Sequence, residues 1–424
     1  MKVKMKQVTY DYVENLKTEK RKPLPRPSFL FSLLIRILSA FELAATKFTY
    51  TKKRMDKVKK EPCLILMNHS SFLDLKIASK LFFPKPYYIV STTDGLIGKE
   101  WLMRRIGCIP TKKFVADIAL TRDMTNALLK KKKSVLLFPE AGYSLDGTTT
   151  VLPKHLGGFI KKLGAPVVTV ITDGAFLYQP LYNDLKIRKV KTSAEVECIL
   201  TKEEIAEKSV DEINALINEK FSFDNFRAQA EKGVKISTPD RADGLHRILY
   251  RCPACQTEGK MLGKGVSLTC THCGKTYFMT EYGRMEAMEG PTEFAHIPDW
   301  TAWERECVRK EIERGEYKLD LNVDIGVIAD HKALYMVGDG KLIHDENGFT
   351  LTGCDDKLTY TQSPITSYTL NSDFFWYEIG DVIGIGNMQR LYYCFPKEKD
   401  VVTKARFATE ELYKIHKAKK ETLE

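Results

Sequence analysis

The sequence predicts an α/β domain, then a small cysteine-rich unit, then a β-rich C-terminal domain. Three patterns predict this order. Short apolar runs alternate with helical segments from residue 61 to about 200, two Cys-x-x-Cys pairs follow at 252–273, and strand patterns fill 316–396. A chain of 424 residues is long enough for two or three domains, each with its own core. With 43% hydrophobic and 29% charged residues, the composition is that of a folded protein and not of a disordered one.

The first 60 residues form a basic arm. They hold 16 Lys and Arg against 5 Asp and Glu, and the rest of the chain is balanced although the whole chain carries +11. Such an arm indicates an anionic partner, either a membrane surface or a nucleic acid. The first apolar run begins only near Phe29 and no small-residue cleavage site follows it, so no secretory signal is expected. Scattered cysteines without an export signal favour a reducing cytosol.

Residues 28–48 of this arm predict an amphipathic helix. Its polar residues recur every three or four positions and therefore fall on one narrow stripe. A membrane-spanning helix would place Arg36 near the bilayer centre, which costs roughly 2.5–3.5 kcal/mol. We therefore expect a monotopic helix at the cytoplasmic face of a membrane, with its polar stripe toward water and the basic clusters 20–22 and 52–54 near phospholipid headgroups. The alternative is a helix packed on the protein's own core. The polar stripe consists of Ser28, Ser32, Arg36, Ser39, Glu42 and Thr46.

Residues 61–232 carry the alternation that predicts the α/β domain. Ligands of such sheets usually bind at strand ends and in the loops beyond them. The predicted strands are 63–67, 87–91, 134–139 and 165–172, and the predicted helices are 72–82, 115–132 and 155–163.

The stretch "LILMNHSSFLDLK" places a histidine and an aspartate just where a buried strand ends. His69 follows Asn68 directly, and Asp74 comes five positions later. One interpretation is a dyad in which the carboxylate orients the imidazole, whose other nitrogen takes a proton from a hydroxyl. The alternative is a turn whose serines cap the next helix. This motif alone leaves both open.

Three later stretches resolve the choice: "GCIPTKK" (107–113), "LFPEAGYS" (137–144) and "APVVTV" (165–170). With the first motif, in this order and spacing, they resemble the glycerolipid acyltransferase family typified by lysophosphatidate acyltransferase. The resemblance covers about 60–200. The matching positions are Asn68, His69 and Asp74 in the first block, Gly107, Ile109 and Lys113 in the second, Phe138, Pro139, Glu140 and Ser144 in the third, and Pro166 in the fourth.

The resemblance implies a mixed sheet flanked by helices and transfer of a fatty acyl group to a lysophospholipid or glycerolipid hydroxyl. The implied donor is a thioester, either acyl-CoA or an acyl carrier protein. His69 is then the general base and Asp74 its orienting partner. A thioester is already activated, so the protein has only to position the hydroxyl, remove its proton and stabilise the oxyanion. The implied substrate-binding residues are Asn68, Lys113, Glu140, Gly142 and Ser144.

Four positions depart from the family pattern and bear on the acceptor. Lys113 stands where the second block has arginine, and Tyr143 replaces the arginine of the third. Ala141 and Gly142 stand where that block has glycine and threonine. The guanidinium of arginine binds phosphate through two parallel hydrogen bonds. Lysine keeps the positive charge but not this geometry, and tyrosine keeps neither. The resemblance therefore does not establish a glycerol-phosphate acceptor. Residues 130–133 offer replacement lysines or simply cations at a helix C-terminus.

Two Cys-x-x-Cys pairs separated by 14 residues predict a zinc ribbon over 248–285, after a polar linker at 233–247. Four thiolates leave no open coordination position, so the zinc is expected to be structural. The alternative is a chance pairing or a dithiol redox site. Near-neutral charge outside the arm argues against a nucleic-acid-binding ribbon. The expected ligands are Cys252, Cys255, Cys270 and Cys273.

Residues 286–424 predict a β-rich domain closed by a helix. A helix is expected over 299–314, capped by Asp299, and a hairpin turns at Asn347-Gly348. About seven short strands before a terminal helix resemble the outline of a pleckstrin-homology-like (PH-like) barrel.

Three functions compete on these patterns. The intact His69–Asp74 pair favours a membrane-surface acyltransferase. A non-catalytic lipid-binding protein that keeps the fold is the alternative, because the third block is altered. Nucleic-acid binding conflicts with the apolar helix between the two basic clusters.

Overall fold

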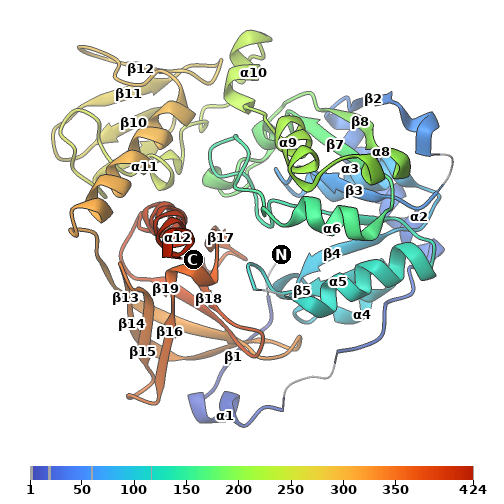
Figure 1. Cartoon of the computed structure of the whole chain (residues 1–424). Helices are drawn as coiled ribbons and strands as arrows, with labels where there is room; N and C mark the ends of the chain where they lie inside the picture. The colour runs from blue at the N-terminus through green and yellow to red at the C-terminus, as the bar shows by residue number, and fades with distance from the viewer. Residues whose placement is uncertain (1–2, 18–20, 59–60, 116, 424) are drawn as a thin grey trace.

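The computed structural model describes residues 3–17, 21–58, 61–115 and 117–423. Within these ranges the strands form three sheets (Figure 1): a seven-stranded sheet, a four-stranded sheet and an eight-stranded sheet. The first belongs to the predicted α/β domain, the second to the cysteine-rich unit and the third mainly to the C-terminal domain.

The seven-stranded sheet is mixed, as the resemblance implied. Five neighbouring strands are parallel, whereas β8 runs antiparallel to β7 and carries β2 parallel to itself at the sheet edge. The central strand is buried on both faces, which explains its unbroken apolar run. The strands lie in the order β2 (Thr49–Lys53), β8 (Ser193–Leu200), β7 (Val167–Asp173), β3 (Leu64–Met67), β6 (Val135–Leu137), β4 (Tyr88–Thr92) and β5 (Cys108–Thr111).

Helices cover both faces of this sheet. The predicted helices 72–82 and 155–163 are confirmed, and the one expected over 115–132 begins later and ends in a π-helical turn at Asn126–Lys130. The helices of the domain are α3 (Leu73–Phe82), α4 (Glu100–Arg105), α5 (Ile118–Thr125), α6 (Leu156–Leu163), α7 (Ala175–Tyr178), α8 (Lys202–Glu207), α9 (Val210–Lys220) and α10 (Asn225–Glu231).

Helix α2 (Phe29–Ala45) confirms the predicted amphipathic helix but reverses its orientation. Its polar stripe faces the protein: Ser39 is buried, and Glu42 pairs with Lys76 of α3 and accepts a hydrogen bond from Tyr178 at 3.3 Å. The prediction that this stripe faces water is therefore wrong, because the α/β domain offers it polar partners. No helix in the described ranges is long and apolar enough to cross a membrane. The opposite face exposes large apolar side chains by 49–77%: Phe29, Leu30, Leu34, Ile37, Leu38 and Phe41.

Most cations flanking α2 have acidic partners inside the chain. Arg21 and Lys22 pair with carboxylates that flank the second block in the sequence. Lys53 and Arg54 pair with carboxylates on β8 and α8. Ion pairs within the chain therefore neutralise part of the positive charge that the sequence suggested for phospholipid headgroups. The pairs are Arg21–Asp117 (3.0 Å), Arg21–Asp123 (2.8 Å), Lys22–Glu100 (2.6 Å), Lys53–Glu195 (2.6 Å) and Arg54–Glu204 (2.5 Å).

The start of the arm lies on the C-terminal domain. Strand β1 (Met5–Gln7) pairs in parallel with β14 (Leu334–Asp345), and helix α1 (Tyr10–Glu14) follows it. Arg390 donates to the backbone oxygen of Glu14 at 3.0 Å. The arm expected over 1–60 is therefore divided between two domains, and its first described residues complete the eight-stranded sheet.

The segment 233–247, expected as a linker, is packed rather than exposed. Ile236, Ala242 and Leu245 are buried, and Arg241 donates to the backbone oxygen of Met279 at 2.6 Å. The cysteine-rich unit then forms an antiparallel sheet of β9 (Met261–Lys264), β10 (Ser267–Cys270), β11 (Thr276–Met279) and β12 (Met285–Ala287).

Seven antiparallel strands and a terminal helix make up the C-terminal domain, which matches the expected outline. Its PH-like identity stays a prediction. Helix α11 (Ile297–Glu313) begins with His296 as N-cap, so Asp299 lies in the first turn instead of capping it. The other elements are β13 (Leu319–Ile328), β14, β15 (Gly348–Gly353), β16 (Leu358–Gln362), β17 (Asn371–Trp376), β18 (Gly380–Gly386), β19 (Leu391–Pro396) and α12 (Val402–Leu423).

Candidate active site

Asn68 fixes the point where the chain leaves the sheet. Its side chain is fully buried, and Oδ1 accepts hydrogen bonds from the backbone N–H of Thr172 at 2.8 Å and from its hydroxyl at 3.1 Å. Since Thr172 lies on β7, this amide joins the ends of two parallel neighbouring strands. The observed hydrogen bonds of Asn68 position the backbone where the strand ends. Its expected contact with a substrate stays a prediction.

His69 and Asp74 form the expected pair. The ring Nδ1 lies 3.0 Å from Asp74 Oδ2, which also accepts the backbone N–H groups of Ser70 at 2.7 Å and Ser71 at 3.0 Å. Asp74 is fully buried in the first turn of α3, where the helix dipole favours a negative charge. A carboxylate is acceptor-only, so Nδ1 carries the proton and Nε2 is the free base.

The imidazole is held between two aromatic rings. The ring centroids of Phe138 and Tyr143 each lie 4.1 Å from that of His69. Phe72 meets Tyr143 edge-on at 5.8 Å. These contacts fix the plane of the imidazole while its side chain stays 20% exposed. Within the described part of the chain, no protein group is hydrogen-bonded to Nε2, which is therefore available to a substrate.

Glu140 holds the backbone around His69. It is buried, its Oε1 accepts the N–H of His69 at 3.0 Å, and its Oε2 accepts the N–H of Thr150 at 2.9 Å. Burial raises the pKa of Glu140 to about 7, although both N–H bonds oppose the rise. From the same loop, Ser144 donates its N–H to the His69 carbonyl at 2.9 Å and its hydroxyl to Thr148 at 2.6 Å. Both polar backbone groups of His69 are thus fixed by the third block.

The turn after β6 is strained and open. Ala141 has φ +54°, a left-handed conformation that favours glycine, and this is the position where the resembled family has glycine. A Cβ added at Gly142 would meet nothing within 4 Å. Open space therefore lies beside this turn.

Lys113 lies near a residue that the motifs did not predict. The pKa of Asp373, in the middle of β17, is raised to about 6 by burial, and the nearby Lys113 opposes that rise. The pKa of the Tyr143 phenol is raised mainly by burial, then by the charge of Asp74, and then by that of the nearby Asp373. The C-terminal domain therefore contributes a carboxylate to the surroundings of the site. Nothing in the sequence signalled Asp373, because it lies outside the resembling region.

The second-block region is attached to the C-terminal domain. Asp94 Oδ2 accepts from Trp376 Nε1 at 3.4 Å and from the Tyr393 hydroxyl at 3.3 Å. Lys112 donates to the backbone oxygen of Met388 at 2.6 Å. The residue before Lys113 thus contacts the C-terminal domain.

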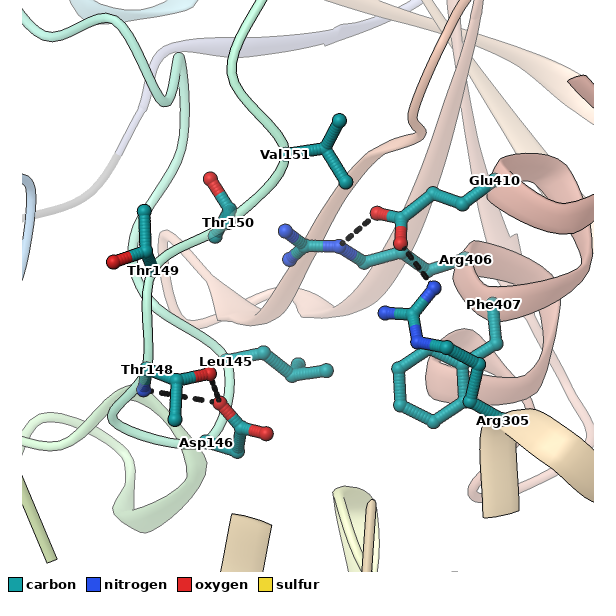
Figure 2. A pocket seen from close by; sticks show the side chains of 10 residues that line it. All are labelled: Leu145, Asp146, Thr148, Thr149, Thr150, Val151, Arg305, Arg406, Phe407 and Glu410. Atoms are coloured by element: carbon teal, nitrogen blue, oxygen red, sulfur yellow. Dashed lines mark hydrogen bonds and ion pairs between the residues drawn. The ribbon is translucent and has the colours of Figure 1, made fainter. Parts of the chain in front are cut away.

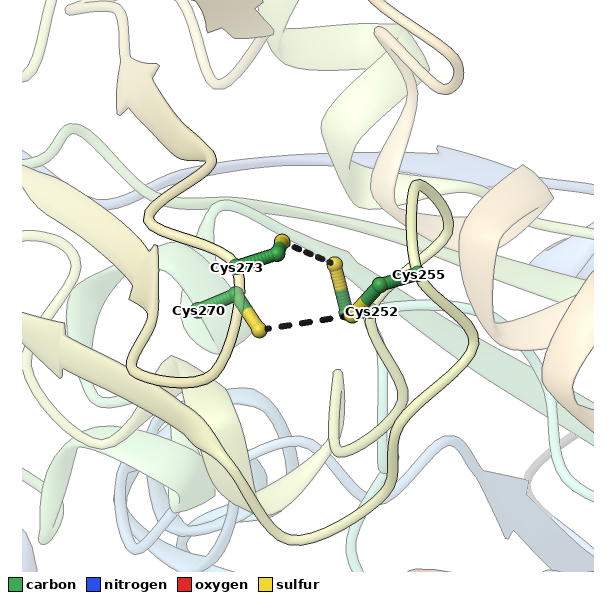
Figure 3. A group of neighbouring side chains, drawn as sticks. All are labelled: Cys252, Cys255, Cys270 and Cys273. Carbon is green, nitrogen blue, oxygen red and sulfur yellow. Dashed lines mark hydrogen bonds between the residues drawn. The ribbon is translucent and has the colours of Figure 1, made fainter.

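The four predicted zinc ligands converge (Figure 3). Their sulfur atoms all lie within 4.8 Å of one another, with Cys252–Cys273 at 3.8 Å and Cys255–Cys270 at 3.7 Å. A tetrahedron with Zn–S bonds of about 2.3 Å has S···S edges of about 3.8 Å, so the cluster fits this ion. His272, which lies inside the second Cys-x-x-Cys pair, is not one of the four clustered residues; its Nδ1 lies 3.4 Å from the Thr257 hydroxyl.

Part of the chain is similar to known acyltransferases. The family model described as Acyltransferase matches residues 48–173. The chloroplast 1-acyl-sn-glycerol-3-phosphate acyltransferase BAT2 of Brassica napus is 33% identical over 126 residues, which are 28% of this chain and 35% of that protein. The chain therefore spans about a third of the length of this relative. The crystal structure of the 1-acyl-sn-glycerophosphate acyltransferase PlsC of Thermotoga maritima matches with a TM-score of 0.35 and 15% identity, covering 45% of this chain and 80% of that one. Residues 48–173 thus form an acyltransferase domain, which is similar in sequence to a 1-acyl-sn-glycerol-3-phosphate acyltransferase.

Proposed function

We propose that this protein is a membrane-surface O-acyltransferase that moves a fatty acyl group from an acyl thioester to a hydroxyl of a lysoglycerolipid. The observation that carries the proposal is the His69 imidazole, bound by Asp74 through Nδ1 and open at Nε2. The lysolipid class is supported by the acyltransferase family of the domain and by the activity in the name of the Brassica relative.

In this mechanism, Nε2 of His69 takes the proton of the acceptor hydroxyl as its oxygen attacks the thioester carbonyl. Asp74 stabilises the resulting imidazolium, because its carboxylate already bonds Nδ1. The tetrahedral intermediate expels the thiolate of acyl-CoA or of an acyl carrier protein, and the imidazolium returns the proton to that thiolate. The products are an ester and a free thiol. The rings of Phe138 and Tyr143 limit water at the base and so oppose thioester hydrolysis.

The apolar face of α2 supports the membrane location. Six large side chains on it are 49–77% exposed, and Phe31 of the same helix contacts the exposed Trp101 of α4 at 5.6 Å between ring centroids. Phe72, three residues after His69, is also exposed. Each such side chain gains up to about 1.5–3 kcal/mol on full burial in an apolar phase. A lipid surface that buries this face places the acceptor and acyl chains beside the base, at the cytoplasmic leaflet expected from the sequence.

The test compares wild-type protein with His69→Ala, using labelled acyl thioesters and a mixed lysolipid extract. We expect turnover in the wild type and a loss of about 10²–10⁴-fold in the variant. His155→Ala is the matched control, because His155 is an exposed histidine of the same domain. Equal turnover in wild type and His69→Ala would refute the mechanism. No turnover in either protein, together with tight lipid binding, would favour the non-catalytic lipid-binding alternative.

A further inference from the structure

Two contacts hold strand β17 of the C-terminal domain against the acyltransferase domain. At the end of the strand, Trp376 Nε1 donates to Asp94 Oδ2 at 3.4 Å. Before the strand begins, Tyr368 meets Phe114 edge-on, with 5.7 Å between the ring centroids. Asp373 lies between Tyr368 and Trp376 in the sequence, so its carboxylate is held at the boundary between the two domains.

A third set of contacts fixes β17 relative to the loop after β6, which faces α11 and α12 across a small cavity (Figure 2). In this loop, Asp146 Oδ2 accepts from the Thr301 hydroxyl of α11 at 2.5 Å. Arg305 of the same helix pairs with Glu410 of α12 at 2.5 Å. The other oxygen of Glu410 accepts from the Thr369 hydroxyl, just before β17, at 2.5 Å. The loop that carries the third block is therefore tied to the start of β17 through two helices.

The Asp373 carboxylate is partly exposed and has an oxygen to offer to a ligand. Its Oδ1 accepts the backbone N–H of Phe374 at 2.9 Å. Among the described residues, no cation lies within 4 Å of either oxygen, although the charge of Lys113 acts on it from farther away. The charge of Asp373 in turn acts on Tyr143, whose ring lies 4.1 Å from the His69 imidazole. Oδ2 can therefore accept a hydrogen bond from a ligand close to the proposed base.

The charges at this boundary leave no excess of positive charge for a phosphate. Lys112 already donates to the backbone oxygen of Met388 at 2.6 Å, and Lys99 lies over the ring of Tyr377, 5.7 Å from its centroid. Asp381, whose charge also acts on Asp373, lies 3.6 Å from Arg247 and so forms a neutral pair. The remaining charges balance. They are the carboxylates of Asp74, Asp94 and Asp373 against the ammonium groups of Lys99, Lys112 and Lys113.

We propose that Asp373 binds the headgroup of the acceptor lipid, and that this headgroup carries a hydrogen-bond donor and no phosphomonoester. The inference rests on the proposed function. A hydroxyl or an ammonium group of the headgroup donates to Asp373, whereas a phosphomonoester would bring its negative charge against this carboxylate. Tyr143, at the position where the resembled family has arginine, fits such a headgroup because no guanidinium is needed. The acceptor therefore differs from the one in the name of the Brassica relative.

The test measures kcat/KM for four acceptors that carry the same acyl chain and differ in the headgroup. Monoacylglycerol offers a hydroxyl, and lysophosphatidylethanolamine offers an ammonium group with N–H donors. Lysophosphatidylcholine has a quaternary ammonium without such donors, and lysophosphatidate has a phosphomonoester. We expect one of the first two to exceed lysophosphatidate by about tenfold or more, the effect of one charge-assisted hydrogen bond. Preference for lysophosphatidylethanolamine identifies the ammonium group as the donor, and preference for monoacylglycerol identifies the hydroxyl.

Asp373→Asn removes the charge and keeps an oxygen for the N–H of Phe374. We expect kcat/KM to fall about tenfold for an ammonium headgroup or severalfold for a hydroxyl, and to rise for lysophosphatidate. A residue with a purely structural role would lower all four values alike. Lys113→Gln removes the opposing charge and should shift the ratio of the preferred acceptor to lysophosphatidate in the other direction. Asp356→Asn, at an exposed turn position with φ +62° that asparagine tolerates, should match wild type.

Highest kcat/KM for lysophosphatidate or lysophosphatidylcholine in the wild type would overturn the inference and leave the proposed function standing. An equal loss for all four acceptors in Asp373→Asn would do the same, with near-UV circular dichroism showing that the variant is folded. No transfer by the wild type to any of the four, nor to the mixed lysolipid extract, would instead overturn the proposed function and the inference with it.

Discussion

The backbone N–H of His69 donates to Oε1 of Glu140 at 3.0 Å, so a buried carboxylate lies directly behind the proposed base. Its second oxygen holds the N–H of Thr150 at 2.9 Å. One side chain therefore couples the segment after β3 to the loop after β6.

This coupling predicts a pH-dependent stability. The native pKa of Glu140 is about 7, above the ordinary value of 4.5, because burial disfavours the charged form. Between those pH values the native state holds a proton that the unfolded state has lost. The free energy of unfolding should therefore fall as pH rises from about 4.5 to about 7, by up to ~3 kcal/mol from this group, and then level off. Urea unfolding of wild type and Glu140→Gln across this range measures it.

Glutamine cannot titrate, so the difference in stability between Glu140→Gln and wild type should change over the same pH range. Glu203→Gln, on the exposed first turn of α8, is the control and should follow wild type. Parallel pH profiles for wild type and Glu140→Gln would contradict the prediction.

Asp74→Asn should abolish most activity without unfolding the protein. The Ser70 and Ser71 N–H groups and Nδ1 of His69 all bond the same oxygen, Oδ2, so an amide oxygen at that position can keep the three hydrogen bonds. The substitution removes the negative charge that stabilises the imidazolium, which makes His69 a weaker base. We expect kcat to fall by about 10²–10⁴-fold with a smaller change in KM. Steady-state kinetics with Asp211→Asn, on an exposed position of α9, provides the comparison, and an unchanged kcat in Asp74→Asn would refute the orienting role.

Ala141→Gly should stabilise the protein. Alanine at φ +54° costs about 1–2 kcal/mol relative to glycine, and glycine loses about 0.5–1 kcal/mol of that gain through backbone entropy. The expected gain in unfolding free energy is therefore about 0.5–1 kcal/mol. Ala206→Gly, on the exposed side of helix α8, should instead lose up to about 1 kcal/mol. Thermal unfolding measures both, and a destabilised Ala141→Gly would show that the strain is compensated by a contact of the Cβ.

Local patterns predicted those parts of the site whose partners are close in sequence or in the sheet. Strand β3 was predicted because it is buried on both faces and thus apolar throughout. The His69–Asp74 pair was predicted through the resemblance of four ordered blocks to an acyltransferase family, because its spacing alone also fits a helix-capping turn; the carboxylate lies on the first turn of α3. Asp373 was not predicted, since it reaches the acyltransferase domain from a separate domain far along the chain.

The orientation of α2 shows a second reason for incomplete prediction. A stripe of polar residues on a helix defines two faces but not the environment of either. Glu42 turned out to face Lys76 and Tyr178, so the polar stripe became the protein-facing side. The charge of the arm was likewise visible in the sequence, whereas its pairing, such as Arg21 with Asp117, depends on the tertiary fold.

Membrane binding should depend on the apolar face of α2 more than on charge. Leu38→Asp and Phe41→Asp introduce charges at positions 62% and 77% exposed, so they should abolish co-sedimentation with vesicles and leave the fold intact. Because Arg21, Lys22, Lys53 and Arg54 are paired within the chain, we expect binding to neutral phosphatidylcholine vesicles to persist at high salt. Ile187→Asp, at an equally exposed isoleucine of the same domain, should bind as wild type. Release by salt alone would show that electrostatics dominates.

The cysteine cluster should hold one zinc ion that supports folding and not chemistry. Its four sulfur atoms are spaced for a closed tetrahedral site with no position left for a substrate. Metal analysis should give about one zinc per chain, and Cys270→Ser should lower both the zinc content and the unfolding temperature, because binding energy of such sites is folding energy. At temperatures where the variant remains folded, its kcat should stay close to wild type. Cys307→Ser, on α11 outside the cluster, should retain the metal, and full zinc retention in Cys270→Ser would show that this thiolate is no ligand.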